Sequence, residues 1–465
     1  MGTLSRASTI ARCLRAACEE GSRKRAFTTS SGSVVDDIVT FARSASQDNF
    51  SQAIDVVRTG MRSKPGDVGL CRLRLVEAEL QAAQVRCVTS HALLRTPFFA
   101  RPDSLTLRDR SFVCQGRWTD AVDLARSAMS LATESSPATS SAEDLKASAE
   151  IELAAALLGT RALLISGRDA DAFQLAQQSL EVARTSFAHG SSEDKRWQAS
   201  VLSMSLAGLV QHASGELESA SDSFESLGSL MDSPHTSLDY LVPEALKQFA
   251  SFSSAQGKKQ QTVDMGLRSI AAAERRLEEA GNGLDLMLSP RAAEEIVADA
   301  KLLMGQTCMA RSAWEDAEEQ LDAAIEVIEG LGSKATLAMG LLPLAEVYAR
   351  TSRVIVAEGL YREITKLLDL DPRAGKNGGA FVHSTVHSFV SWRYAQLLTV
   401  LPKRETEAAA WKNLSYASYE EAPLRRLTAP DVVFGSLDRL SGKGTSGDGV
   451  ILDLMTRRCL PKFDR

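Results

Sequence analysis

The sequence predicts an all-α protein, an α-solenoid of about seven irregular helical hairpins. Two observations carry this prediction: a short phrase typical of a turn between helices recurs along the chain, and the apolar residues between its copies have helical spacing. Composition agrees, because aromatic residues make up only 6% of the 465 residues while alanine, serine, leucine and glutamate are abundant. An all-β fold is therefore nearly excluded.

The recurring phrase marks the turn inside each helical hairpin. It starts with a small residue and has alanine five positions later. A small turn residue ends one helix where a Cβ would be crowded, and alanine early in the next helix lets the two axes approach closely. Copies begin at Gly116, Gly167, Gly215, Ser312 and Ser352, with a variant at Gly257 and an eroded copy at Asn49.

This phrase resembles the tetratricopeptide repeat (TPR). The best copy runs from Lys301 to Ala324, with Gly305 at the glycine of the family pattern, Ala317 at a small position and Leu321 at the large one. The resemblance covers most of residues 36–420. Successive turns lie 40 to 55 residues apart, whereas the standard repeat has about 34, so the hairpins are predicted to be long and irregular.

The resemblance implies a concave groove that binds an extended peptide or a helix. Carrying over the groove-facing positions of the family gives seven partner-groove candidates: Arg161, Leu209, His212, Lys247, Gln306, Glu346 and Arg350. The alternative for each is a contact between neighbouring repeats. If Arg161 and Lys247 face the groove, reversing their charges removes a partner and leaves the thermal midpoint nearly unchanged.

No catalytic, cofactor-binding or metal site is predicted. In the C-terminal glycine-rich loop, Leu437 and Gly444 stand where a phosphate-binding loop needs glycine and serine or threonine. His383 and His387 are spaced to share a metal ion, but Ser384 stands where a metalloprotease has glutamate, and no third ligand is evident. Two buried or partly exposed histidines are the favoured interpretation, and the protein is predicted not to be an enzyme.

Residues 1–33 have the pattern of a mitochondrial targeting presequence. This segment is basic, with a net charge of +4, and Arg12 and Arg15 interrupt any apolar run long enough for a secretory signal. Residues 25–30 resemble a processing site. The alternatives are a basic tail that is not cleaved and a plastid transit peptide.

The rest of the chain carries a net charge of −10, which does not favour a nucleic-acid partner. The longest uncharged run, residues 197–215, is too polar for a membrane span. We therefore expect three regions: the presequence 1–33, the repeat domain 34–420, and a C-terminal extension 421–465 with a flexible glycine-rich loop and a short helix around Val450 to Cys459.

The presequence together with long-period repeats is similar to plant mitochondrial TPR-like proteins of the short-and-swollen-root type. That resemblance implies a non-enzymatic scaffold or assembly factor in the mitochondrial matrix, which binds mitochondrial proteins and supports the respiratory chain through iron–sulfur cluster assembly. The oligomeric state is left open. The alternatives are a structural subunit of a large mitochondrial complex, such as the ribosome or ATP synthase, and an RNA-binding helical repeat, which the irregular period and acidic body disfavour.

Overall fold

The computed structural model describes residues 39, 42–43, 50–62, 69–81, 122–130, 142–185, 193–231, 242–279, 290–373, 382–421, 430–434 and 449–463. The predicted presequence, the Gly116 turn and residues 442–448 of the glycine-rich loop lie outside these ranges. Among the described residues, no helix is long and apolar enough to cross a membrane.

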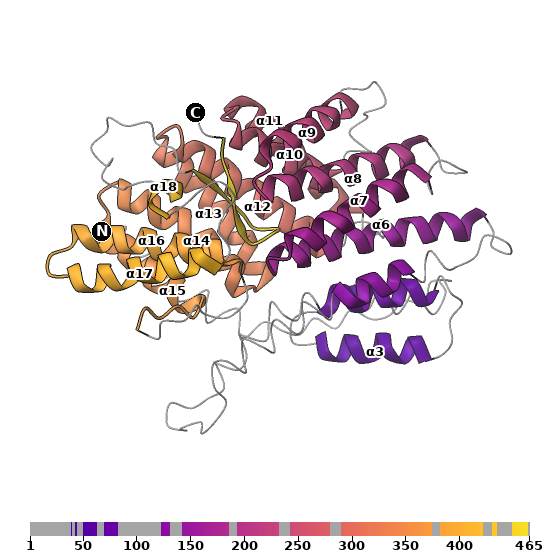
Figure 1. Cartoon of the computed structure of the whole chain (residues 1–465), viewed down its shortest axis with the longest axis horizontal. Coiled ribbons are helices and arrows are strands. Elements are labelled where there is room, and N and C mark those ends of the chain that lie inside the picture. Colours follow the sequence, from indigo (N-terminus) through magenta and orange to yellow (C-terminus); the bar gives the residue numbers. More distant parts are fainter. Residues whose placement is uncertain are drawn as a thin grey trace.

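The described residues between 142 and 421 form helical hairpins that stack side by side, as the sequence predicts (Figure 1). The pairs are α6 (Ala142–Ile165) with α7 (Asp169–Thr185), α8 (Glu193–Ala213) with α9 (Leu217–Met231), α10 (Pro243–Ala255) with α11 (Lys259–Glu279), α12 (Pro290–Met309) with α13 (Trp314–Leu331), α14 (Lys334–Arg350) with α15 (Val354–Leu367), and α16 (Ser384–Val400) with α17 (Glu405–Glu421). Near the N-terminus, α3 (Phe50–Arg62) packs with the helix at 69–81 around Val57 and Leu73. The predicted fold class, an all-α solenoid, is confirmed.

The predicted turns have the backbone conformation that favours glycine. All five predicted turn residues in the described ranges have positive φ, between 57° and 77°: Gly167, Gly215, Gly257, Ser312 and Ser352. The first turn shows the hydrogen bonds of a helix ended by a left-handed residue, because the N–H of Gly167 donates to Leu164 O and the N–H of Arg168 to Leu163 O. The residue five positions after each turn is fully buried: Ala172, Ala220, Thr262, Ala317 and Ala357.

Gly305 allows α12 and α13 to touch. A Cβ built on Gly305 would lie 2.6 Å from Leu321 Cδ2 and 2.7 Å from Leu321 Cγ, closer than real side chains approach. We expect Gly305→Trp to lower the free energy of unfolding by about 1–3 kcal/mol, because overpacking forces neighbours off their preferred geometry. Urea unfolding measures this. Gly359→Trp is the control, since nothing lies within 4 Å of that position; equal stability of the two variants would contradict the close packing.

The C-terminal segment is a β-hairpin, so the predicted short helix around Val450 to Cys459 is wrong. Strands β1 (Val450–Asp453) and β2 (Arg458–Pro461) pair antiparallel, with Asp453 opposite Arg458. The turn between them is closed by Asp453, whose Oδ2 accepts a hydrogen bond from the N–H of Thr456 at 2.9 Å. A short apolar run such as Val-Ile-Leu suits either a helix or a strand, and here burial on both faces decides for the strand.

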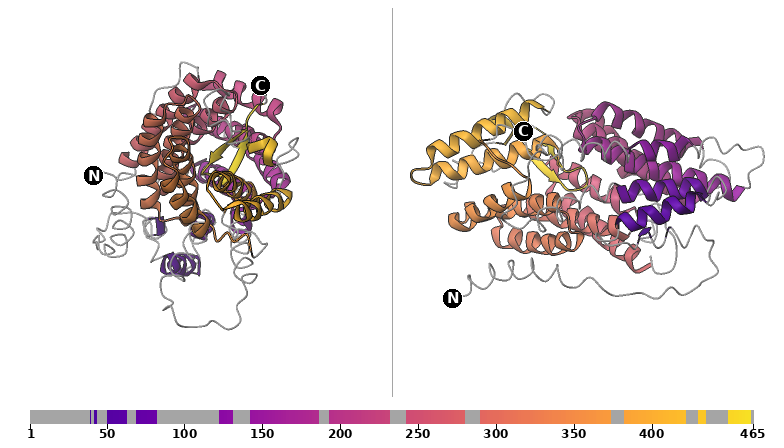
Figure 2. Two further views of the ribbon diagram at one scale, coloured as in Figure 1. Left: turned by 90° about the vertical axis from the view of Figure 1, so that its left-hand side faces the viewer. Right: turned by 90° about the horizontal axis from the view of Figure 1, so that it is seen from below.

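The β-hairpin lies inside the solenoid. Strand β1 packs on α10 and α12, and β2 packs on α8 and α16. Figure 2 shows the two strands within the space that the helices surround. Every residue from 450 to 461 is buried. The first helices of four pairs, α8, α10, α12 and α16, which the resemblance placed on the concave side, therefore contact a strand of the same chain.

Candidate protein-binding groove

The inner groove is formed by α8, α10, α12, α14 and α16, and the β-hairpin fills much of it. Apolar side chains supply part of this fit: Ile451 and Leu460 are 1% and 0% exposed and belong to the core cluster that also contains Leu209. The predicted groove residue Leu209 is thus a core residue of the same cluster as the hairpin.

Side chains of the groove bind the backbone at the edges of the β-hairpin. Gln306 donates from Nε2 to Leu452 O at 3.0 Å and accepts at Oε1 from Leu452 N at 2.9 Å. Thr385 Oγ1 accepts from Cys459 N at 3.2 Å, and His212 Nε2 lies 2.8 Å from Pro461 O. These side chains satisfy strand groups that a neighbouring strand would otherwise pair. The inner groove is therefore built to hold an extended backbone.

A buried cation lies between a groove carboxylate and a hairpin carboxylate. Lys247 Nζ forms ion pairs with Asp299 of α12 and with Asp453 of β1, and all three side chains are 1% exposed or less. Asp299 also accepts the N–H groups of Leu454 at 3.0 Å and Met455 at 3.3 Å. Burial lowers the pKa of Lys247, while Asp299 acts in the opposite direction. This buried cluster fixes the tip of the β-hairpin on α10 and α12.

Arg161 lies at the same tip. Its Nη2 is 2.5 Å from Glu244 Oε1 and 3.8 Å from Met455 Sδ. Its side chain is 14% exposed, so it also contributes to the wall that covers the hairpin. Arg161 is thus paired with an acid of α10 and in contact with the hairpin turn.

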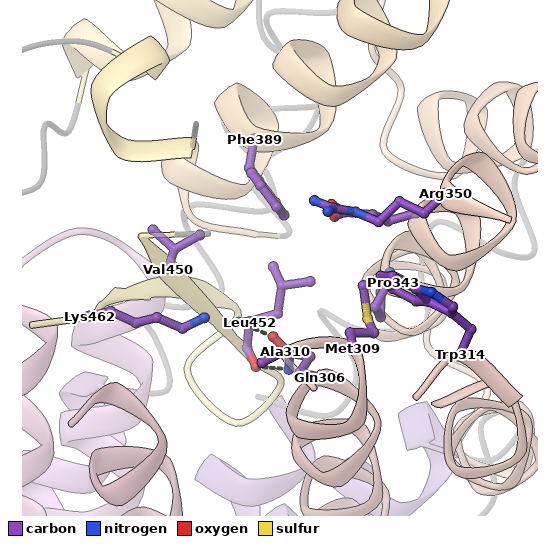
Figure 3. A pocket seen from close by; sticks show the side chains of 11 residues that line it. Gln306, Met309, Ala310, Trp314, Pro343, Arg350, Phe389, Val450, Leu452 and Lys462 are labelled. Carbon is purple, nitrogen blue, oxygen red and sulfur yellow. Dashed lines mark hydrogen bonds and ion pairs between the residues drawn. The ribbon is translucent and has the colours of Figure 1, made fainter. Parts of the chain in front are cut away.

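A small cavity remains at the end of the groove formed by α12, α14 and α16. It has a volume of about 40 Å³, and Gln306, Trp314, Glu346, Arg350, Phe389 and Lys462 are among the residues that line it (Figure 3). Glu346 accepts from Arg350 Nη2 at 2.6 Å and lies 3.6 Å from Arg393 Nη2. The Arg350 guanidinium lies 5.9 Å from the Trp314 ring centroid. The cavity therefore combines apolar and aromatic walls with fixed charges.

The structure divides the seven predicted groove residues into three sets. Arg161, His212, Lys247 and Gln306 contact the β-hairpin, Glu346 and Arg350 line the cavity together with Gln306, and Leu209 is in the core. Asp299 and Thr385 also bind the β-hairpin and were not predicted from the sequence. Asp299 had a local signal, since it is a lone acid in the apolar run Val297-Ala298-Asp299-Ala300 of a predicted helix. Thr385 had none.

His383 and His387 lie at the start of α16. His383 caps this helix, with Nδ1 accepting from Thr385 N at 3.3 Å and lying 2.8 Å from Thr385 Oγ1. Burial lowers the pKa of His387 to about 4 and lowers the pKa of His383 as well. In the part of the chain that the structure describes, no three His, Cys, Asp or Glu side chains cluster as metal ligands do.

The fold and the groove define the class of this protein, an α-solenoid of helical hairpins whose inner surface holds an extended segment of the same chain. No family model and no curated protein matches the chain.

Solved structures with some likeness are helical proteins from several sources. A STAND signal-transduction ATPase with a tetratricopeptide repeat sensor from Pyrococcus horikoshii is 11% identical, with a TM-score of 0.37 over 83% of this chain and 54% of its own. BtubC from P. vanneervenii is 16% identical, with a TM-score of 0.35 over 54% of this chain and 87% of its own. The apo form of RapI is 13% identical, with a TM-score of 0.32 over 66% and 85%. At these TM-scores the likeness assigns no function.

Proposed function

We propose that this protein is a non-enzymatic scaffold that binds a partner protein through its inner groove. The observation that carries the proposal is the pair of hydrogen bonds between the Gln306 amide and the backbone of Leu452. A side-chain amide on the groove wall that binds both the N–H and the C=O of one strand residue recognises extended peptide irrespective of its sequence. The cavity next to Gln306 leaves room for a small chemical group beside the β-hairpin.

The finer proposal is an assembly factor of the mitochondrial matrix that supports the respiratory chain, with iron–sulfur cluster assembly as the pathway. Its support is the basic, arginine-containing segment at residues 1–33 and the resemblance to plant mitochondrial TPR-like proteins. A structural subunit of the mitochondrial ribosome or ATP synthase is the alternative. The two differ in stoichiometry, because a structural subunit is present at a constant ratio to its complex and an assembly factor is not.

Affinity purification of the full chain from mitochondria, with partners identified and quantified, tests the proposal. The variant Lys462→Glu reverses a charge that lines the cavity, and Lys366→Glu reverses one that is 78% exposed on α15. We expect Lys462→Glu to reduce recovery of the partner about tenfold, as loss of one important interface residue does, and Lys366→Glu to leave it unchanged. Equal recovery with both variants would place the partner outside the groove.

The matrix address predicts a processed N-terminus. Because the basic segment ends at residues 25–30, we expect the native protein to begin between Thr28 and Asp36. N-terminal sequencing of the protein purified from mitochondria measures this. A native protein that begins at Met1 or Gly2 would contradict mitochondrial targeting by a cleaved presequence. It would not affect the proposed binding of a partner in the groove.

A further inference from the structure

The helix pairs α6–α7 and α8–α9 face the pair α16–α17 across a cavity of about 560 Å³. One wall comes from α6–α7 and α8–α9 and includes Asp169, Phe173 and Glu216, and the other comes from α16–α17 and includes His383 and Glu421. Among the described residues, the helices α6 to α9 make few or no direct contacts with α16 and α17. Arg458 of the β-hairpin also lines this cavity. The β-hairpin therefore spans the gap between these two groups of helices, which direct helix packing does not close.

Strand β2 and the residue before it hold both groups of helices at once. On one side, Arg458 donates to Asp169 Oδ1 from Nη1 at 2.8 Å and to Asp169 Oδ2 from Nη2 at 3.2 Å, a bidentate pair with the first residue of α7. On the other side, Arg457 O accepts from His383 N at 2.9 Å, and Cys459 N donates to Thr385 Oγ1. Three consecutive residues thus connect α7 to the start of α16.

We propose that the C-terminal β-hairpin is an intramolecular ligand of the inner groove that keeps the solenoid closed. When it is bound, the two groups of helices are fixed across the cavity. When it is released, the two groups separate, and the wall formed by α8, α10 and α12 becomes available to another extended segment.

The contacts of the β-hairpin define the chemistry of such a replacement segment. Lys247 and Asp299 form an ion pair without the hairpin, and Asp453 adds the second carboxylate to Lys247. Ile451 and Leu460 supply apolar side chains on the adjacent strands. The fitting partner is therefore an extended, apolar segment that carries one carboxylate opposite Lys247. This description of the partner segment deepens the proposed function and rests on it. Closure of the solenoid by the β-hairpin does not depend on the proposed function.

Reversing the charge of Arg458 tests closure in the full chain. Arg458→Glu brings a carboxylate to Asp169, Glu216 and Glu421, so we expect the radius of gyration in solution scattering to increase and amide exchange of residues 450–461 to quicken about tenfold or more. Arg184→Glu, an exposed change on α7, is the control and should alter neither. The charge-swapped double variant Asp169→Arg with Arg458→Glu should restore both readouts, which separates the ion pair from general damage to folding.

A peptide supplied in trans tests whether the β-hairpin is replaceable. We expect a fluorescent peptide of residues 447–463 to bind the Arg458→Glu protein and not the wild type, because only the variant frees its groove. The same peptide with Asp453→Asn should bind about tenfold more weakly, since Lys247 then lacks its second carboxylate.

Each outcome decides the proposal. An unchanged radius of gyration and unchanged exchange in Arg458→Glu would overturn closure by the hairpin. Opening without capture of the peptide would show that the hairpin is a fixed part of the core, which would overturn its role as a ligand. A failure of Lys462→Glu to release partners affects the proposed function alone, because scattering and amide exchange need no partner.

Discussion

Replacing Lys247 by glutamate is expected to reduce the free energy of unfolding by about 3–5 kcal/mol or more, the range for breaking a buried ion pair by removing one partner. The side chain is 0% exposed and lies between Asp299 and Asp453. In the variant three carboxylates would meet in a fully buried site, so either they repel one another or they must take up protons. Because Asp453 belongs to β1, the β-hairpin should loosen first.

Urea unfolding followed by circular dichroism measures the effect, and amide exchange shows whether residues 450–461 open before the helices. Lys366→Glu is the matched control, because its side chain, paired with Glu363, is 78% exposed and such pairs contribute about 0–1 kcal/mol. If Lys247→Glu is as stable as Lys366→Glu, the buried cluster does not exist in solution. From the sequence, reversing the charges of Arg161 and Lys247 was expected to leave the thermal midpoint nearly unchanged. Because Lys247 is fully buried, the reversal is now expected to lower it.

The repeat register could be predicted from sequence because each turn depends on local chemistry. A glycine or serine in the left-handed region and a small residue five positions later are visible within six residues of the chain. The turn between α16 and α17 shows what that rule misses: Lys403 has a φ of 62°, and Ala408, five positions later, is 4% exposed. Ala408 fits the recurring pattern, but Lys403 is not a small residue, so this turn was not recognised from the sequence.

The occupant of the groove could not be predicted in the same way. The groove positions follow from helical periodicity, but their contacts join residues far apart in sequence: Lys247 and Asp453 are 206 positions apart, and Gln306 and Leu452 are 146 apart. No local pattern links such residues. The strand itself was ambiguous, because an apolar run of three residues acquires its conformation from the surface that buries it.

The three buried histidines of the groove region predict a loss of stability in mild acid. Burial lowers the pKa of His212 and of His387 to about 4 and lowers that of His383 too. His212 is enclosed by the Phe252 ring, 5.4 Å away, and by Pro461 O at 2.8 Å. His212 and His387 take up protons near pH 6.5 in the unfolded chain and only near pH 4 in the folded chain. The stabilisation is therefore present above about pH 6.5 and is lost as the pH falls towards 4.

We expect His212 and His387 each to account for a loss on the order of 2 kcal/mol of unfolding free energy between pH 7 and pH 5. Urea unfolding at several pH values measures the slope. In the double variant His212→Gln with His387→Gln, both sites stay neutral, and the amide introduced at the first position keeps a donor for Pro461 O. Its unfolding free energy should therefore fall by about 4 kcal/mol less than that of the wild type over this range, since the carboxylates titrate alike in both proteins. Parallel pH profiles would mean that both imidazoles are protonated as readily in the folded protein as in the unfolded chain, and that the hairpin does not seal the groove.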